Sequence, residues 1–390
     1  MLDLTIGTTL PADGYAGTLV GRAWLPHLSG PSPVAIRESG VFDVSKAFAT
    51  VSELGESADP AAALAAVEGV RIGSLEEILA NTPLPARDRD SPWLLAPVDL
   101  QSLKAAGVTF AVSMIERVIE ERVHGDADAA ASMRGDILSE IGVDLASIRP
   151  STPEAETLRA ILVKRGLWSQ YLEVGIGPDA EIFTKGSTLS AMGTGVPVGV
   201  LAASQWNNPE PEVALLVAST GSIWGSTLGN DVNLRDIEGR SALLLPKAKD
   251  NNASCGLGPF IRAFDSTFDL DAVRAMRVTL EVDGLEGFHL EGHSDMSSIT
   301  RDPAELVRQL IGAHHQYPDG AVLMLGTMFA PIVDRDAPGR GFTHHPGDVV
   351  RISSDALGTL VNSVMPSEEC EPWEFGIRAL MANLSSRSLL

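Results

Sequence analysis

The chain has 390 residues, of which 44% are hydrophobic and 21% are charged, and its formal net charge at pH 7 is −22. This length suffices for two or three domains, while the negative charge argues against sequence-independent nucleic-acid binding, which needs a surface rich in lysine and arginine. Two cysteines, Cys255 and Cys370, are too few for a disulfide framework or a cysteine zinc site.

Neither a secretory signal nor a membrane span is expected. The first residues contain no basic stretch followed by an apolar run. The longest apolar segment, around residues 321–333, is too short and too interrupted to cross a bilayer. These features predict a cytoplasmic protein that does not associate with membranes.

Residues 15–45 predict a small β module, because short runs rich in strand-forming residues alternate there with glycine and serine turns. Two short helices are expected next, over residues 59–69 and 74–82, and each begins at a residue that favours the N-cap position. The proline-rich and charged segment 84–98 follows them and is typical of a connection between structural units.

This segment places a predicted domain boundary near residue 90. We expect a small N-terminal α/β module over residues 1–90, followed by a larger region over residues 91–390. The larger region opens with a predicted amphipathic helix over residues 110–142, where apolar residues recur at helical spacing with dense charge on the other face.

From residue 171 onward the pattern changes to short strands with frequent glycine. A short helix over residues 302–316 interrupts them. This mixture predicts an α+β fold dominated by strands and not a regular βαβ array. The predicted strands cover residues 171–178, 181–186, 212–219, 278–284 and 348–354.

The stretch WNNPEPEVALLV, residues 206–217, is the most informative for function. If it forms a strand, Glu210 and Glu212 project from one face, because side chains alternate with period two. Neighbouring carboxylates repel unless a cation or proton lies between them. Asp231 follows a glycine turn that can bring it beside this strand, and three such carboxylates suit Mg²⁺ or Mn²⁺. In isolation the two glutamates would more often be a solvated strand face.

Three further polar residues are weaker candidates. Lys249 is either a solvated charge or an ammonium donor that points into a cleft. Arg235 is suited to binding a substrate carboxylate, although a surface ion pair is the simpler interpretation. Thr327, which follows a predicted strand, either holds an anion together with nearby backbone amides or forms a turn.

Two pairs of adjacent histidines, at positions 314–315 and 344–345, suggest a zinc site at first sight. Both pairs lie in turn-like segments, and adjacent histidines seldom bind one metal together. Structural or substrate-rim roles are therefore the better interpretation. Trp206 is expected to be a packing residue, although it is close enough to Glu210 in sequence to form a wall of a pocket there. Cys255 is expected to be buried.

Four segments together resemble the fumarylacetoacetate hydrolase family, and the resemblance extends over roughly residues 90–390. It implies a β-rich mixed-sheet roll with a small N-terminal β module. It also implies that Glu210, Glu212 and Asp231 bind magnesium, that Lys249 is the active-site lysine, and that Arg235 and Thr327 line the substrate pocket. The segments are NPEPEVALL (208–216), GNDVNLRD (229–236), AKDNNASCGLGP (248–259) and LGTMFAP (325–331).

One departure from the family bears on the reaction. Hydrolases of this family carry a motif close to Y-x-x-H-x-x-E, whose histidine and glutamate activate water for carbon–carbon cleavage. The matching stretch, residues 110–116, has Ser113 in place of the histidine and retains Glu116. Ser113 is expected to bind the substrate together with Arg235 and Thr327. Serine cannot accept a proton near neutral pH as histidine does, so carbon–carbon hydrolysis is not expected. The absence of this histidine resembles the dehydratase branch of the family. In related dehydratases a glutamate before the metal-binding pair is implicated in the reaction, and Glu181 is its match in this sequence.

That branch acts on 2-keto-3-deoxy sugar acids. The resemblance implies a magnesium-dependent dehydratase of D-xylose degradation that converts 2-keto-3-deoxy-D-xylonate to 2-ketoglutarate semialdehyde through a metal-stabilised enolate. Glu116 or Glu181 is expected to transfer a proton at C4, and Lys249 is expected near C3. Family members often associate, so a homodimer or homotetramer is expected.

Four alternatives remain open at this point. Acylpyruvate hydrolysis and oxaloacetate decarboxylation would use the same metal site. A dehydratase that forms a Schiff base through Lys249 would leave the carboxylates with a structural role. A non-catalytic protein that binds sugar acids would keep the site without turnover.

Overall fold

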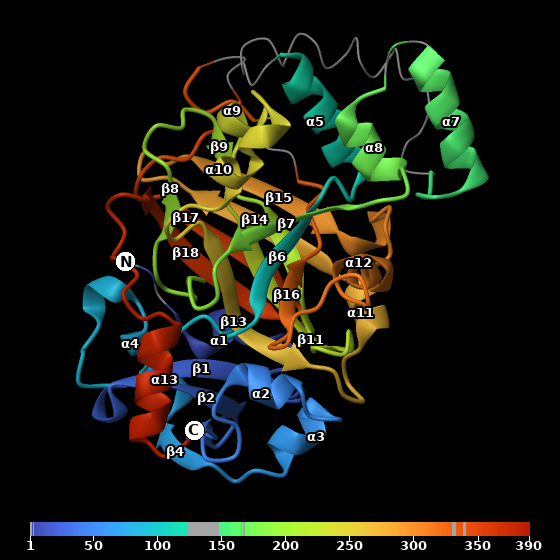
Figure 1. Cartoon of the computed structure of the whole chain (residues 1–390). Coiled ribbons are helices and arrows are strands. Elements are labelled where there is room, and N and C mark those ends of the chain that lie inside the picture. Colours follow the sequence, from blue (N-terminus) through green and yellow to red (C-terminus); the bar gives the residue numbers. More distant parts are fainter. Residues whose placement is uncertain are drawn as a thin grey trace.

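The computed structural model describes the whole chain except residues 1, 3, 124–147, 165, 167, 330–332 and 338–340. The described residues form an α+β fold with one large mixed sheet and a smaller five-stranded sheet (Figure 1). This architecture confirms the predicted fold class. None of the helices in the described part is long and apolar enough to cross a membrane.

The large sheet runs in the order β4-β3-β2-β1-β13-β11-β10-β16-β6-β7, and β5 pairs with β1. Neighbours pair antiparallel except β16 and β6, which are parallel. Its strands are β1 Leu19–Leu25, β2 Gly30–Arg37, β3 Gly40–Asp43, β4 Val70–Gly73, β5 Trp93–Leu94, β6 Ser102–Gly107, β7 Glu181–Gly186, β10 Pro211–Val217, β11 Ile223–Asp231, β13 Cys255–Ala263 and β16 Ala321–Met324.

The predicted N-terminal β module is present as strands β1 to β3. These strands are joined to the rest of the large sheet through β1, which pairs antiparallel with β13, with Leu19 opposite Arg262. The N-terminal strands therefore extend the same sheet that carries the candidate site. The domain boundary near residue 90 stays a prediction.

The smaller sheet runs in the order β15-β14-β17-β18-β8, and β9 pairs separately with β12. The predicted strands over residues 278–284 and 348–354 are confirmed by β14 and β17. The strands are β8 Val198–Val200, β9 Asn207–Asn208, β12 Asn233–Leu234, β14 Arg277–Asp283, β15 His289–Asp295, β17 Val349–Ser354 and β18 Gly358–Pro366.

The central strand β10 is buried on both faces. Val213 and Leu215 belong to the apolar core that the large sheet shares with the five-stranded sheet. Ala214 and Leu216, on the alternate face, belong to the core shared with α2 and α3. A strand that is covered on both faces has apolar side chains at successive positions, which explains the sequence VALLV of residues 213–217. Such burial fixes the register of β10 and hence the position of the carboxylates that precede this run.

Helices cover the sheets and their ends, with α5, α7 and α8 grouped at one end of the molecule (Figure 1). The helices are α1 Ile6–Thr9, α2 Val51–Gly55, α3 Pro60–Ala65, α4 Leu75–Asn81, α5 Ala111–Arg122, α7 Pro153–Lys164, α8 Gln170–Ile176, α9 Arg235–Glu238, α10 Leu245–Lys249, α11 Leu270–Arg274, α12 Pro303–Leu310 and α13 Ile377–Ser386, with 3₁₀ turns η1 Pro26–Leu28, η2 Leu84–Ala86, η4 Ala242–Leu244 and η5 Met296–Ser298.

The predicted helices over residues 59–69, 74–82 and 302–316 are confirmed as α3, α4 and α12, each shorter than expected. The helix expected over residues 110–142 is described only as α5, and residues 124–142 lie outside the described part of the chain.

The strand predicted over residues 171–178 is wrong, because this segment forms helix α8. Ser169 caps the helix by accepting a hydrogen bond from the Leu172 N–H at 3.4 Å. Leu172 and Ile176 are one helical turn apart and pack with α5 and α7 in one apolar cluster. The short apolar run therefore belongs to a buried helix face, which alternation alone does not distinguish from a strand.

Candidate active site

Glu210 and Asp231 face each other across two antiparallel strands. Pro211 is opposite Asn230 in the pairing of β10 with β11. The backbone N–H of Asp231 then donates to the carbonyl of Glu210 at 3.1 Å. Glu212 lies two residues further along β10 and so projects from the same face as Glu210. The hydrogen-bonding register therefore brings together the three carboxylates that the sequence predicts as a group.

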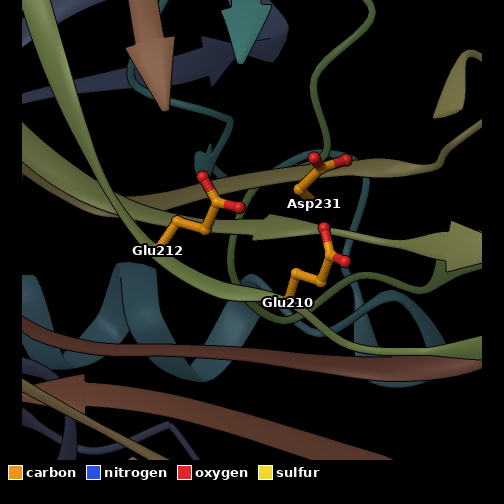
Figure 2. Close-up of side chains that lie close together, drawn as sticks. All are labelled: Glu210, Glu212 and Asp231. Atoms are coloured by element: carbon orange, nitrogen blue, oxygen red, sulfur yellow. The ribbon is translucent and has the colours of Figure 1, made fainter. Parts of the chain in front are cut away.

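One ligand oxygen from each carboxylate lies within 4.8 Å of the others. Figure 2 shows Glu210 and Glu212 on one segment of chain and Asp231 on its neighbour, with the carboxylates directed toward a common space. All three residues are buried. Because this apolar surrounding weakens hydration, three such charges require a cation or a proton among them.

The electrostatic environment separates Glu212 from Asp231. Burial raises the pKa of Glu212, and the nearby carboxylates of Asp231 and Glu210 raise it further. Burial also acts to raise the pKa of Asp231, but the ammonium groups of Lys185 and Lys249 outweigh this effect and lower it. The cationic side chains of the site therefore offset the negative charge of Asp231, but they do not fully offset that of Glu212.

This donor set fits a hard divalent cation. Three carboxylates that converge without histidine or cysteine are the ligand type of Mg²⁺ and Mn²⁺. The raised pKa of Glu212 supports the fit: burial is its largest cause and the charges of Asp231 and Glu210 add to it, and a bound cation would offset these charges. Glu210, Glu212 and Asp231 are the residues that would hold such an ion.

Lys249, the last residue of α10, reaches into this group. Its Nζ donates to Glu210 Oε2 at 2.5 Å and to Asp231 Oδ2 at 3.0 Å. Burial lowers the pKa of Lys249, but the carboxylates of Asp231 and Glu210 outweigh burial and raise it, so the side chain is an ammonium at neutral pH. The sequence left open whether Lys249 is a solvated charge or an ammonium donor that points into a cleft. In the structure its side chain is buried and points into the cleft.

Two further basic residues hold the carboxylates, and sequence reasoning missed both. Lys185 of β7 lies with its Nζ 2.8 Å from Asp231 Oδ1 and donates to the backbone carbonyl of Lys249 at 2.6 Å. Arg117 of α5 donates to Glu210 Oε1 at 2.8 Å and pairs with Glu238 at 2.7 Å. No local sequence signal marks Lys185, because a buried lysine on a short strand has the same pattern as a solvated one.

The carboxylates open onto a cleft between β6, β7, α5 and the segment after β16. Four other predicted site residues line it, namely Ser113, Glu181, Lys249 and Thr327. The cleft is also lined by residues that the sequence did not single out, which include Gly107, Arg117, Phe183, Glu238 and Gly326.

Glu181 stands opposite Gly107 in the pairing of β7 with β6. A side chain at position 107 would place its Cβ 2.0 Å from Glu181 Oε2, so glycine leaves the space that this carboxyl occupies. Burial, reinforced by the charge of Glu238, raises the pKa of Glu181 to about 7. Glu181 is therefore a carboxyl group that holds a proton for part of the time near neutral pH.

Ser113 lies in the first turn of α5, where its hydroxyl is used by the backbone. Its Oγ donates to the Phe110 carbonyl at 2.8 Å and accepts from the Phe110 N–H at 3.2 Å. The hydroxyl therefore stabilises the start of the helix at the edge of the cleft.

Glu116 and Arg235 are brought together beside the cleft but do not belong to its lining. Glu116 Oε2 accepts from Arg235 Nη2 at 3.2 Å, and both side chains are buried. The guanidinium of Arg235 also lies over Trp206, 4.1 Å from the ring centre. Trp206 thus packs against Arg235 and in the apolar cluster of α5 and α8, as expected of a packing residue, and it is not among the described residues that line the cleft.

The segment after β16 completes the cleft through Gly326 and Thr327. The N–H of Gly326 donates to Glu212 Oε2 at 2.7 Å. Gly326 has φ +84°, and a Cβ there would lie 2.1 Å from Thr109 Oγ1. Only glycine fits this conformation and space. The Oγ1 of Thr327 accepts from the Phe329 N–H at 3.1 Å, which is the turn interaction that the sequence allowed.

The histidine pairs take part in local hydrogen bonds and ion pairs. His344 Nδ1 lies 3.1 Å from Asp348, and His345 Nε2 lies 3.0 Å from Asp336. Within the described residues, neither pair joins a group of ligands able to hold a metal. Their interpretation as structural histidines agrees with these contacts.

Comparison with known proteins places these observations in context. Residues 177–365 match the family described as fumarylacetoacetate (FAA) hydrolase C-terminal. The chain is 28% identical over 334 residues to the probable 2-keto-3-deoxyxylonate dehydratase of Haloferax volcanii, which covers 85% of this chain and 94% of that protein. It is 31% identical over 184 residues to the 2-dehydro-3-deoxy-D-arabinonate dehydratase of Saccharolobus solfataricus, across 47% of this chain and 58% of that one.

Among solved structures, the fold is similar to that of a 2-keto-3-deoxy-D-arabinonate dehydratase complexed with magnesium and 2,5-dioxopentanoate. The TM-score is 0.60 at 20% sequence identity, over 90% of this chain and 99% of the other. An apo form of that enzyme gives a TM-score of 0.59 at 21% identity, over 90% and 99% of the two chains. At this level of identity the likeness establishes the shared fold.

Proposed function

We propose that this protein is a divalent-metal dehydratase, because residues 177–365 match the family described as fumarylacetoacetate (FAA) hydrolase C-terminal. Its substrate is a 2-keto-3-deoxy-D-pentonate, the 3-deoxy keto acid shared by the xylose and arabinose series, and its product is 2,5-dioxopentanoate (2-ketoglutarate semialdehyde). The observation that carries the proposal is the buried group of Glu210, Glu212 and Asp231 with Lys249 beside it in one cleft. The names of the two curated relatives support the choice of substrate.

The reaction removes one water from the substrate. A proton leaves C3 and hydroxide leaves C4, which creates a C3–C4 double bond. Two hydrogens then move from C5 and its oxygen to C3 and C4, and C5 becomes an aldehyde. Mg²⁺, or Mn²⁺ in its place, would act as a Lewis acid toward the carboxylate and 2-keto oxygen of the acid.

The chain must supply a proton to the hydroxide that leaves C4, and we assign this role to Glu181. It lines the cleft, and burial together with Glu238 raises its pKa to about 7. A carboxyl that is protonated near neutral pH is an efficient general acid there. Glu116 was the other candidate, but its pairing with Arg235 outside the cleft lining favours a supporting role.

Lys249 is assigned to the C3 side of the substrate. Its ammonium already lies at the carboxylate group, 2.5 Å from Glu210 and 3.0 Å from Asp231. A cation there stabilises negative charge that develops next to the 2-keto group when the C3 proton leaves. The ammonium state also argues against Lys249 as the nucleophile of a Schiff-base mechanism, which requires a neutral amine.

Carbon–carbon hydrolysis of acylpyruvates is the less favoured reaction at this site. It would need a base that activates water where Ser113 stands. The Ser113 hydroxyl is not basic near neutral pH, and it is engaged with the Phe110 backbone. No described contact favours oxaloacetate decarboxylation over dehydration, so it serves as a comparison in the test.

The test is incubation of the purified chain with 2-keto-3-deoxy-D-pentonate in the presence of Mg²⁺, Mn²⁺ or EDTA, with NMR detection of the C5 aldehyde. Acylpyruvates and oxaloacetate are run in parallel. We expect turnover of the pentonate with either ion and its loss in EDTA. Turnover that persists in EDTA and is trapped by borohydride on Lys249 would replace this mechanism with Schiff-base chemistry. No aldehyde under any condition would refute the proposed reaction.

We further propose that the enzyme works in D-xylose degradation, in the cytoplasm, as a homodimer or homotetramer. The name of the Haloferax volcanii relative supports the pathway. Size-exclusion chromatography with light scattering tests the assembly, and a monomer at micromolar concentration would contradict it.

A further inference from the structure

A second cavity lies away from the carboxylate cleft, between β1, β5 and the C-terminal segment 370–375. Its volume is about 580 Å³, which is within the range of roughly 300–1,000 Å³ that small-molecule sites occupy. No residue of its lining also lines the cleft of the carboxylates. The dehydratase reaction therefore leaves this cavity unexplained, and an inference about it does not depend on that reaction.

One wall of the cavity is aromatic. Trp24 of β1 is opposite Trp93 of β5 in the strand pairing, and their rings stack with centroids 5.8 Å apart and planes 16° from parallel. Phe375 meets Trp24 edge-on at 5.3 Å. These three residues all line the cavity. They present the flat apolar surfaces on which a planar ring stacks favourably.

The same wall carries a buried positive charge, Arg22. It lies two residues before Trp24 on β1, so both side chains project from one strand face toward the cavity. Arg22 is only 6% exposed, and its Nη1 donates to the Val98 carbonyl at 2.9 Å. Among the described residues, no carboxylate lies within ion-pair distance of this guanidinium. The nearby Asp99 uses its oxygens to accept backbone N–H groups.

Arg87 supplies a second cation at this wall. Its guanidinium lies over Trp93, 4.9 Å from the ring centre. Its Nε is buried and has no hydrogen-bond partner among the described residues. Burial lowers the pKa of Arg87 to about 10, which reflects the same lack of solvation. Arg87 Nη2 donates to the Thr82 carbonyl, so the Nε is the donor of this side chain that is left without a partner. A buried donor without a partner is costly unless another group accepts from it.

We propose that this cavity binds a small anion that carries a flat aromatic ring and is about the size of a mononucleotide. The ring stacks against Trp24 and Trp93, and the carboxylate or phosphate group pairs with Arg22 and Arg87. Asp90, Glu371 and Glu374 also line the cavity, so the anionic group must lie on the side of Arg22 and Arg87. Binding therefore depends on this local pair of cations.

The first test uses the unmodified full chain and isothermal titration calorimetry. Adenosine monophosphate and benzoate are the two ring-bearing anions, while adenosine and inorganic phosphate each lack one of the two features. We expect at least one ring-bearing anion to bind tenfold or more tightly than adenosine and than phosphate. Tighter binding of adenosine monophosphate assigns a nucleotide ligand, and tighter binding of benzoate assigns an aromatic carboxylate. Equal or absent binding of all four probes would overturn the proposal.

Variants then locate the site. Arg22→Met and Arg87→Met should each weaken binding of the preferred anion at least tenfold, and Arg22→Lys should weaken it less because the charge is kept. Arg240→Met is the control and should leave binding unchanged, because Arg240 is exposed and does not line the cavity. Circular dichroism verifies folding, and Arg87→Met decides the result if Arg22→Met does not fold. Wild-type affinity in both methionine variants would contradict this location.

Discussion

Lys185 Nζ lies 2.8 Å from Asp231 Oδ1, and both side chains are excluded from solvent. The same ammonium donates to the backbone carbonyls of Val232 and Lys249. Lys185 thus fixes the orientation of a proposed metal ligand and the position of Lys249 at once. It acts as a positioning residue for the carboxylate group.

Replacing Lys185 with methionine should therefore destabilise the protein when no divalent ion is present. Loss of one partner from a buried ion pair leaves the other charge uncompensated and costs about 3–5 kcal/mol. Urea unfolding should show this decrease, and Mg²⁺ should restore part of it because the ion neutralises the same carboxylate. Lys247→Met, at an exposed position on α10, is the control. Equal stability of Lys185→Met and wild type would contradict the assigned role.

Replacing Glu212 with glutamine should change stability and metal binding in opposite directions. Burial and the charges of Asp231 and Glu210 raise the pKa of Glu212, so a neutral side chain relieves repulsion in the metal-free protein. Thermal unfolding in EDTA should shift to higher temperature. Mg²⁺ affinity, measured by calorimetry, should fall by on the order of 100-fold because one ligand is lost. A variant that keeps wild-type affinity would exclude Glu212 from the metal site.

The pH dependence of turnover tests Glu181. Since its pKa is raised to about 7, a general acid at this position is protonated below that pH and loses its proton above it. We expect kcat to fall as the pH rises through 7. Glu181→Gln should lower kcat by about 10²–10⁴-fold and abolish this limb of the profile. Glu291→Gln, on the exposed edge of β15, should leave the profile unchanged. If kcat of Glu181→Gln still falls as the pH rises through 7, another group causes the pH dependence and the assignment of Glu181 is wrong.

Gly326 offers a test with a closely matched control. Gly326→Ala combines an unfavourable φ of +84° with a Cβ contact of 2.1 Å to Thr109. Gly287 has the same φ, but a Cβ there meets nothing within 4 Å. The backbone penalty, about 1–3 kcal/mol, is thus common to both variants. Only Gly326→Ala should also weaken Mg²⁺ binding, because the displaced N–H no longer holds Glu212 in place. Similar metal affinity in the two variants would refute this link.

The sequence predicted the part of the site that follows from strand periodicity. Glu210 and Glu212 share a face because side chains alternate, and the apolar run after them fixes the register that places Asp231 opposite. Lys185 and Arg117 were missed because their roles depend on how β7 and α5 pack against β10. No local pattern distinguishes a buried lysine from a solvated one on a strand of six residues.

Helix α8 shows the corresponding limit for the fold. Its residues form a short apolar run that also suits a strand, and the decision depends on the Ser169 cap and on packing against α5. The separation of Glu116 from the cleft lining has a similar cause. Its pairing with Arg235 connects residues 119 positions apart, which sequence spacing does not reveal.

The central claim is that Glu210, Glu212 and Asp231 together hold one divalent ion. The most direct measurement is an anomalous difference map from a crystal of the full chain soaked in Mn²⁺. We expect a single strong peak among these three carboxylates, coordinated by an oxygen of each. Carboxylates that stay empty while a peak appears elsewhere, for example at His344 or His345, would contradict the account.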